Sequence, residues 1–390
     1  MSRIFVNSIY HVLLISIVLG GFFSRTLITT PASLVREACL WVLVLLSIWF
    51  ARAGAVRVTG YARYGLAILF VSFVFGGLVT LAYNFNVQEI SNKWAVLYKF
   101  FQIFLLLLVF SSYRALTGKM LSQLVRWFVI YCCAYALVSP LVYLFPLSIM
   151  VENFRWWGRF GVGYPTMDAQ LFIFAICFVI FGSVFKGFFK LAVLAICLLG
   201  AALQVTGTGA VTTVFVVGLY CIMNVRAALR LAPPLILIVA VGAVGVNFLS
   251  PEITSDATDL VLIKADNLLG NSSSVNTMDI RQDQYDSLIY MIRGDDLANV
   301  FGIGTGIYVE NQYGFSRVAL GWFGLTCLLA FIALICLEAW RRRGADKSLF
   351  LASCGVLVIS SYTLTYFYLF PLNAAFALAM CYSEELKARG

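Results

Sequence analysis

The stretch Val318–Glu338 reads "VALGWFGLTCLLAFIALICLE", and its only charged residue is the last one. About 20 apolar residues in a row are long enough to cross the hydrocarbon core of a bilayer as a helix. Backbone polar groups in lipid must be hydrogen-bonded within their own segment, and the stretch lacks the alternation of a barrel strand. It therefore predicts a transmembrane helix.

The same pattern recurs along the whole chain. The 390 residues are 62% hydrophobic and 12% charged, whereas a soluble domain is about half apolar and a quarter charged. We predict an all-α polytopic membrane bundle of about twelve transmembrane helices, forming a single membrane domain over residues 1–390. The predicted spans are 4–22, 37–51, 64–83, 95–112, 127–148, 168–185, 189–205, 209–224, 231–249, 318–338, 347–366 and 369–383.

The distribution of charge predicts the orientation of this bundle. If the N-terminus is cytoplasmic, most of the 27 lysines and arginines fall on the inner side, as the positive-inside rule requires. The net charge of +9 is then a topology signal and requires no nucleic-acid partner. We expect a bacterial inner-membrane protein with both termini in the cytoplasm. Two outer segments would face the periplasm, a short loop at 150–167 and a large, partly helical loop at 250–317.

The large outer loop contains a helical pattern from Asn276 to Gly294. Two residues along a helix turn about 200°, so Arg281 shares a face with Tyr285, while the acidic residues lie on nearly the opposite face. An arginine on the buried face of a helix is costly unless it meets an anion. Arg281 is therefore a candidate anion ligand.

The short outer loop carries two arginines, Arg155 and Arg159, beside two tryptophans. Basic residues on the outer side run against the positive-inside trend. One interpretation is an interfacial aromatic belt with snorkelling arginines. The other, which we favour, is that at least one of the two arginines binds an anion.

A glycine-rich stretch, "NVFGIGTGIYVENQYGF" from Asn299 to Phe315, leads into the span with which we began. Glycines 302, 304 and 306 allow a sharp turn or a close approach to a ligand. They place Glu310 at the membrane boundary, where a carboxylate can serve as a general base. The alternative is a structural turn in which Glu310 pairs with an arginine such as Arg317.

At these outer segments the chain resembles the Wzy-type O-antigen polymerases and, more distantly, the related O-antigen ligases. The resemblance covers most of the chain as architecture and only the outer motifs as sequence. Its stretches are Gly158–Gly161 with Pro165–Met167, the helix bearing Arg281 and Tyr285 that leads to Phe301–Gly304, and Glu310–Tyr313 followed by Gly321–Gly324.

Two positions depart from the family pattern. Ligases of this superfamily typically carry histidine where this chain has Glu310, which favours a polymerase over a ligase. Relatives often show serine-arginine where this chain has Thr208-Gly209. One family arginine is therefore missing, and Arg155, Arg293 or Lys99 would have to replace it.

The resemblance implies glycosyl transfer between two undecaprenyl-diphosphate-linked oligosaccharides, which serve as donor and acceptor. The leaving diphosphate needs permanently charged cations, and the attacking hydroxyl needs a base. Glu310 and Arg281 are the expected catalytic residues. The expected substrate- and diphosphate-binding residues are Arg155, Arg159, Arg293, Arg317, Asn311, Tyr285 and Tyr313.

The composition and the resemblance also predict which cofactors and partners the protein uses. The chain has one histidine and no DxD motif, so we expect neither a metal nor another cofactor. Besides the lipid substrates and the bilayer, a Wzz-type co-polymerase that regulates chain length is an expected partner.

Two other functions remain open. One is an O-antigen ligase or another lipid-linked glycosyltransferase. The other is a transporter, with a lipid-linked oligosaccharide flippase as the nearest case, because Lys99 within a span and glycine-broken helices would suit it. A transporter needs paired polar residues on several helices near the bilayer midplane, and no repeat between the two halves of the chain is evident.

Overall fold

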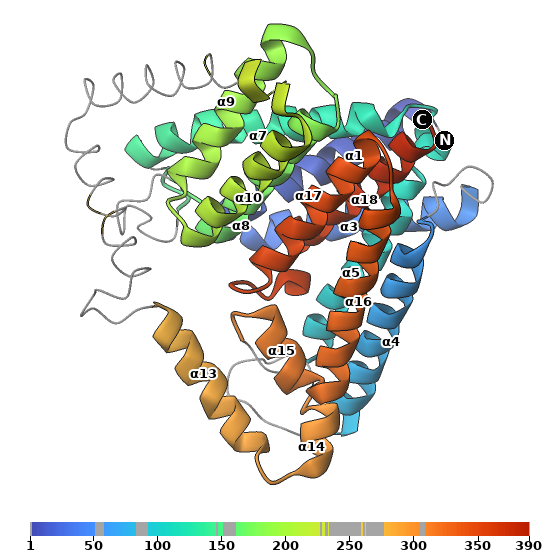
Figure 1. Cartoon of the computed structure of the whole chain (residues 1–390), viewed down its shortest axis with the longest axis vertical. Helices are drawn as coiled ribbons and strands as arrows, with labels where there is room; N and C mark the ends of the chain where they lie inside the picture. Colours follow the sequence, from blue (N-terminus) through green and yellow to red (C-terminus); the bar gives the residue numbers. More distant parts are fainter. Residues whose placement is uncertain are drawn as a thin grey trace.

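The computed structural model describes residues 2–50, 58–82, 93–145, 147–150, 161–226, 228–230, 233, 259, 262, 277–304 and 309–389. Within these ranges every regular element is a helix, and the only extended pairing is an isolated bridge between Thr26 and Met150 (Figure 1). The elements in chain order are α1 (Arg3–Val18), α2 (Gly20–Phe23), α3 (Thr29–Phe50), α4 (Tyr61–Ala82), α5 (Lys93–Ser111), α6 (Tyr113–Thr117), α7 (Leu121–Leu144), α8 (Pro165–Phe181), α9 (Gly187–Leu203), α10 (Gly207–Met223), α13 (Thr277–Ile292), α14 (Asp296–Phe301), α15 (Gln312–Ala319), α16 (Gly321–Arg341), α17 (Ala345–Ser360), the 3₁₀ helix η2 (Tyr366–Tyr368) and α18 (Phe370–Lys387).

The prediction of an all-α protein is confirmed for the described residues. Each predicted span except 231–249, of which only residue 233 is described, overlaps a helix. Helices α3, α4, α7 and α16 are long and apolar enough to cross a membrane by length and composition, and α1, α5, α8, α9 and α10 are shorter apolar helices. The number of spans stays a prediction, as do the limits of the outer loops.

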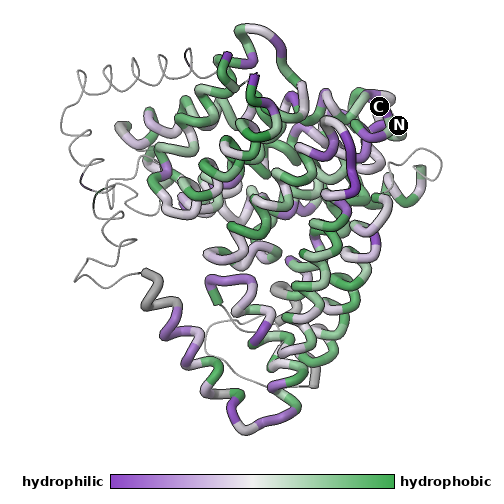
Figure 2. The backbone as a smooth tube through the Cα atoms, viewed as in Figure 1, coloured by the Kyte–Doolittle hydropathy of each residue, from purple (hydrophilic) through white to green (hydrophobic). Residues whose placement is uncertain are grey.

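Two helices form the centre of the bundle. Every residue of α8 from Met167 to Phe181 is buried, and so is every residue of α18 from Phe370 to Glu385. A helix that is apolar all round is stable only when other helices surround it. By contrast α3 exposes large apolar side chains such as Trp41, Leu45 and Trp49, the surface expected of a helix that faces lipid. Hydrophobic residues run along most of the helices of the bundle (Figure 2).

Local signals in the sequence explain where these central helices begin. Pro165 and Pro371 each lie in the first turn of their helix, where the missing N–H would have no helical partner. The structure also corrects the end of one predicted span. The predicted span 347–366 ends as an α-helix at Ser360, and residues 361–369 form a turn and η2 that fold back over the end of the bundle.

The molecule has two distinct ends (Figure 1). Helices α13, α14 and α15 lie together at one end, and the two chain termini lie at the other. There, Arg3 near the N-terminus approaches Gly118, and Arg389 near the C-terminus contacts the sulfur of Met120. The candidate catalytic residue Glu310 belongs to the first of these ends.

The helix predicted between Asn276 and Gly294 is confirmed as α13. Its face pattern also agrees, because Asp283 and Asp286 are exposed while Leu288 packs against the core and Ile292 is buried. The side chain of Arg281 lies outside the described part of the structure, as do Arg155 and Arg159 altogether.

Candidate functional site

Glu310 directly precedes the start of α15. Asn311 caps this helix, because its Oδ1 accepts hydrogen bonds from the backbone N–H groups of Tyr313 (2.9 Å) and Gly314 (3.2 Å). A side-chain acceptor at this position satisfies amide groups that have no partner within the helix. The cap fixes the backbone beside Glu310. It also occupies the Oδ1 atom of Asn311, the side-chain acceptor of a residue that we predicted to bind substrate.

The glycines before Glu310 allow this segment to pack closely against other parts of the backbone. Gly302 and Gly304 adopt positive φ angles of 81° and 91°, which favour glycine. A Cβ on Gly302 would lie 2.3 Å from the backbone carbon of Ala319, and one on Gly304 would lie 2.8 Å from the Cα of Thr80. The N–H groups of Ile303 and Gly304 donate to Val318 (3.1 Å) and Ala319 (2.9 Å). This packing fixes the end of α15 and explains both glycines without a ligand.

Gln312 fastens the Glu310 segment to residues 361–367. Its backbone N–H donates to the carbonyl groups of Ser361 (2.8 Å) and Leu364 (3.1 Å). Its side-chain Oε1 accepts from the N–H of Phe367 (3.1 Å), and Nε2 donates to Ser316 Oγ (3.3 Å). The side chain is completely buried. The position of Glu310 is therefore set by its second neighbour along the chain.

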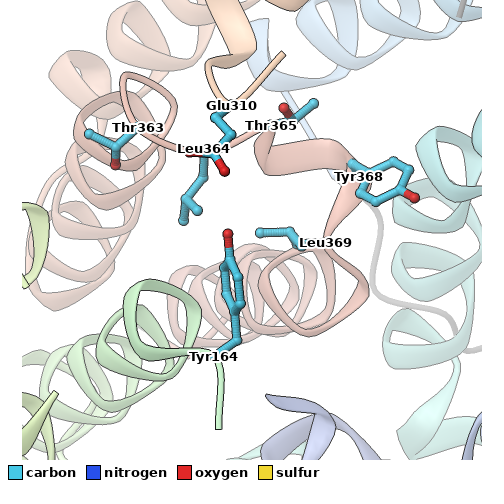
Figure 3. Close-up of a pocket in the computed structure, with 7 residues that line it drawn as sticks. All are labelled: Tyr164, Glu310, Thr363, Leu364, Thr365, Tyr368 and Leu369. Atoms are coloured by element: carbon cyan, nitrogen blue, oxygen red, sulfur yellow. The ribbon is translucent and has the colours of Figure 1, made fainter. Parts of the chain in front are cut away.

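A pocket lies between Glu310 and this fold-back (Figure 3). It holds about 220 Å³ of empty space, open solvent included. Ligand pockets usually measure about 300 Å³ or more, whereas the enclosed part of this one has room for about one water molecule. A sugar would therefore have to lie in the open space at its mouth. The hydroxyl of Tyr164 points toward Glu310 from the opposite side. The lining residues are Tyr164, Glu310, Thr363, Leu364, Thr365, Tyr368 and Leu369.

The pocket brings together three sequence segments that are far apart in the chain. Tyr164 lies between the two parts of the first outer motif, directly before Pro165. Thr208, at the position where relatives of the resembled family carry serine-arginine, hydrogen-bonds Thr363 through the two hydroxyl oxygens (2.8 Å). Glu310 belongs to the third motif. The structure thus collects parts of separate motifs around one cavity.

Several helices also begin at this pocket. Tyr164 is the N-cap residue of α8 and Leu369 that of α18, and neither helix start has a side-chain cap. Helix α10 begins at Gly207, beside Thr208, and α15 begins two residues after Glu310. A helix N-terminus carries partial positive charge, so several of them around one cavity favour an anionic group.

Arg317 does not pair with Glu310, so the structural alternative raised by the sequence is wrong for this arginine. Its guanidinium donates to the backbone oxygen (3.3 Å) and the side-chain oxygen (2.7 Å) of Asn299. It also lies 4.5 Å from the ring centroid of Trp322. Burial lowers the pKa of Arg317, but arginine titrates so far above neutrality that the group stays charged. Arg317 joins α15 to α14.

The other predicted ligands lie around α13 and α15, outside the lining of the pocket. Tyr285 packs against Gly314, where an added Cβ would approach its ring to 3.1 Å. The hydroxyl of Tyr313 donates to the carbonyl of Val358 (3.1 Å), and burial raises its pKa. Arg293 is exposed where α13 ends. The assignment of these residues to a substrate stays a prediction.

Sequence reasoning missed most of the pocket wall. Thr363 and Thr365 were assigned to the predicted span 347–366, and Tyr368 lay between that span and the next. Tyr164 lay between the two parts of the first outer motif and was given no role. The available signal was a run of hydroxyl-bearing residues, "SYTLTYFY", directly before Leu369, Phe370 and Pro371. Polar residues next to a helix-starting proline are typical of a turn that carries function.

The pocket contains a carboxylate, Glu310, that could accept a proton, and several residues of its lining carry hydroxyl groups. A general base must lie within hydrogen-bond reach of the proton that it removes. Glu310 lines the pocket together with the hydroxyl-bearing residues Tyr164, Thr363 and Thr365. The hydroxyl of Thr365 donates to the carbonyl of Val309, and that of Thr363 accepts from Thr208. No cluster of three or more histidine, cysteine or acidic side chains occurs within the described ranges that would suit a metal ion.

Replacing Gln312 with methionine is expected to lower activity on the order of 10- to 100-fold, because a small displacement of a catalytic group has such effects. The change also leaves the buried N–H of Phe367 without an acceptor, which costs about 1–3 kcal/mol of folding free energy. Activity per folded protein and thermal unfolding are the measurements. Gln123→Met on α7, at an exposed position, is the matched control. Unchanged activity per folded molecule would show that Gln312 does not position Glu310.

The sequence matches no model of a known protein family, and no curated protein matches it either. The functional assignment therefore depends on the geometry around Glu310 and on the motifs that meet there.

Proposed function

We propose that this protein is a membrane-embedded glycosyltransferase that polymerises undecaprenyl-diphosphate-linked oligosaccharide repeat units into O-antigen or a similar surface polysaccharide. The observation that carries the proposal is the meeting of Tyr164, Thr208 and Glu310 around one pocket, through Thr363. Each of the three belongs to a segment in which the sequence either resembles the Wzy-type polymerases or departs from them at one defined position.

The proposed reaction uses Glu310 as the general base. A sugar hydroxyl of the acceptor attacks the anomeric carbon of the donor, and its proton passes to Glu310. A new carbon–oxygen bond forms while the bond from the anomeric carbon to the diphosphate oxygen breaks. The electron pair leaves with the lipid diphosphate, and Glu310 returns its proton to solvent. The reaction as proposed needs no metal.

The leaving diphosphate requires fixed positive charge. Arg281 keeps its proposed catalytic role because it lies one helical turn before Tyr285 on α13, and Tyr285 contacts α15 through Gly314. Arg155 and Arg159 remain proposed diphosphate ligands. Arg317 is a weaker candidate, since Asn299 already occupies part of its donor set.

The proposal includes a topology of twelve spans in the bacterial inner membrane, with both termini cytoplasmic and residues 250–317 in the periplasm. The basic inner loops support this orientation. We expect Ser272→Cys to react with a membrane-impermeant thiol reagent in cells whose outer membrane is permeable. The background should lack the exposed Cys221 and Cys336. Labelling of Ser272→Cys only after lysis would contradict the topology.

The test of function is reconstitution of the purified protein with lipid-linked repeat units. Polymerase activity predicts a ladder of lipid-linked products that differ by one repeat unit. Transfer of single units to a lipid A-core acceptor, without a ladder, would indicate a ligase instead. The absence of any new glycosidic bond would overturn the assignment as a transferase.

A flippase is the second candidate, and one observation favours it. Buried polar groups pair between helices inside the bundle: Tyr135 of α7 donates to Asp168 of α8 (2.9 Å), and Gln170 of α8 donates to Thr212 of α10 (3.4 Å). Intramembrane polar pairs of this kind are common in transporters. Translocation of a labelled lipid-linked oligosaccharide across vesicles, without polymer formation, would support it.

A further inference from the structure

Lys99 is an uncompensated cation within an apolar helix. It lies on α5, where the residues from Phe100 to Ser111 carry no charge. Its side chain is half-buried, and its ammonium lies 3.8 Å from the ring centroid of Tyr368. In the part of the chain that the structure describes, no carboxylate forms an ion pair with it. A half-buried charge without a counter-ion costs free energy and is retained where it serves a ligand.

The nearest carboxylate along α3 and α5 is already engaged. Glu37 accepts hydrogen bonds from Arg36 (2.9 Å), from the hydroxyl of Tyr98 (2.6 Å) and from the amide of Gln102 (3.0 Å). Arg36 also stacks on Phe370, at 4.5 Å from the ring centroid. The pair of Arg36 and Glu37 is neutral as a unit, so the positive charge of Lys99 remains unbalanced.

Two buried amide oxygens beside Lys99 have no hydrogen-bond donor among the described residues. One is Oε1 of Gln102, one turn further along α5, in a residue that is 1% exposed. The other is Oδ1 of Asn373, a fully buried residue whose amide nitrogen donates to the backbone oxygens of Lys99 (3.5 Å) and Phe367 (2.7 Å). Buried polar atoms are normally satisfied. Hydroxyl groups of a ligand, or water molecules bound with it, would supply these donors.

Lys99 adjoins the Glu310 pocket through Tyr368, which lines that pocket (Figure 3). Leu369, the N-cap residue of α18, lines it as well. The partial positive charge of that helix start adds to the charge of the ammonium. The side of the pocket formed by Tyr368 and Leu369 is therefore electropositive.

We propose that Lys99 is the core of an anion-binding subsite that takes a phosphate group, and that the phosphate belongs to a lipid headgroup. Lysine binds phosphate as a compact point charge. The exposed apolar face of α3, which packs beside α5, is suited to the acyl or prenyl chain of such a lipid. Only the identity of the lipid rests on the proposed function. If the proposed function holds, this subsite binds the diphosphate of one lipid-linked substrate. It would then replace the cation that is missing at Thr208-Gly209.

The first measurement is stability without ligand. Lys99→Met is expected to leave the thermal unfolding temperature unchanged or to raise it, because it removes an uncompensated charge from an apolar helix. A purely structural contact between Lys99 and Tyr368 predicts the reverse. A clear loss of stability in the ligand-free variant would overturn the proposal.

The second measurement is binding to the purified full-length chain in nanodiscs. The probes are undecaprenyl diphosphate, an anionic phospholipid and inorganic pyrophosphate, each tested separately. Lys99→Met should weaken binding of the lipid diphosphate about 10- to 100-fold, the effect of losing one contact to a charged group. Lys99→Arg should retain most of it.

The control variant is Lys190→Met. Lys190 is also half-buried, contacts an aromatic ring (6.0 Å from the centroid of Tyr220) and lies on another helix, α9. Its removal should not change binding. Equal affinity of Lys99→Met and wild type for all three probes would overturn the subsite. Loss of affinity for pyrophosphate alone would contradict a lipid source, and loss for all anionic lipids alike would identify a general headgroup site. Because binding is measured without polymerisation, failure of the proposed function leaves this result interpretable.

Discussion

Glu310→Gln is expected to reduce polymer formation by about 10²- to 10⁴-fold, the usual effect of losing a general base. Glutamine keeps the shape and the hydrogen-bonding capacity of the side chain but cannot accept the proton of the acceptor hydroxyl. Folding should be unaffected, because the hydrogen bonds of Asn311 and Gln312 hold the backbone directly after Glu310. Glu310→Asp shortens the reach by one methylene group and should retain partial activity.

The measurement is polymer formation from purified lipid-linked repeat units, normalised to folded protein. Asp296→Asn is the matched control, because Asp296 is an exposed acidic residue in the first turn of α14, away from the pocket lining. Its activity should equal that of wild type. Near-normal activity of Glu310→Gln would rule out the base. An equal loss in Asp296→Asn would attribute the effect to the net charge of the outer end.

Arg317 provides a further discrimination. Since its donors go to Asn299, Arg317→Ala should loosen the junction of α14 and α15 independently of Glu310. The effects of independent sites add, whereas paired residues show a coupling energy. Additive effects of the two substitutions on stability are therefore expected. A coupling energy above about 0.5 kcal/mol would restore the salt bridge between them.

The helices could be predicted from sequence because their signals are local. An apolar run such as Leu171–Phe181 or Val318–Leu337 contains its own evidence for a helix. The two faces of α13 could be predicted because the spacing of residues along a helix determines on which side each side chain lies. The starts of α8 and α18 were marked by prolines. None of these inferences required knowledge of what lies beside the segment.

The pocket could not be predicted in the same way because its walls are contributed by tertiary contacts. Thr363 and Tyr368 line it only because Gln312 fastens residues 361–367 against α15. The role of Gly302 depended on a neighbour, Ala319, that the sequence does not identify. The same holds for Lys99, whose lack of a counter-ion is visible only once Glu37 is seen to be engaged.

A buried ionic cluster at the end of the molecule opposite to Glu310 joins three parts of the chain. The side chain of Arg342 is 1% exposed and donates to Glu338 (3.2 Å), Glu384 and Ser383 (2.8 Å). It also lies 4.0 Å from the ring centroid of Phe350. The two carboxylates in turn accept from residues before and at the start of α4, Thr59 (3.0 Å) and Tyr61 (3.0 Å). The cluster thereby connects α16, α18 and α4.

Arg342→Leu is expected to destabilise the protein by about 3–5 kcal/mol, because it leaves buried carboxylates without their cation. Lys387 contacts Glu338 (3.3 Å) but is itself half-exposed, so it compensates only in part. The measurement is thermal unfolding of the purified protein in detergent. The double variant Arg342→Leu with Glu384→Gln should recover part of the loss, since one of the two abandoned charges is removed with its partner. Arg343→Leu, at the neighbouring exposed position, should unfold like wild type. If Arg342→Leu and Arg343→Leu were equally stable, the cluster would contribute no more than a surface charge, and the joining of α16, α18 and α4 would have to come from apolar packing alone.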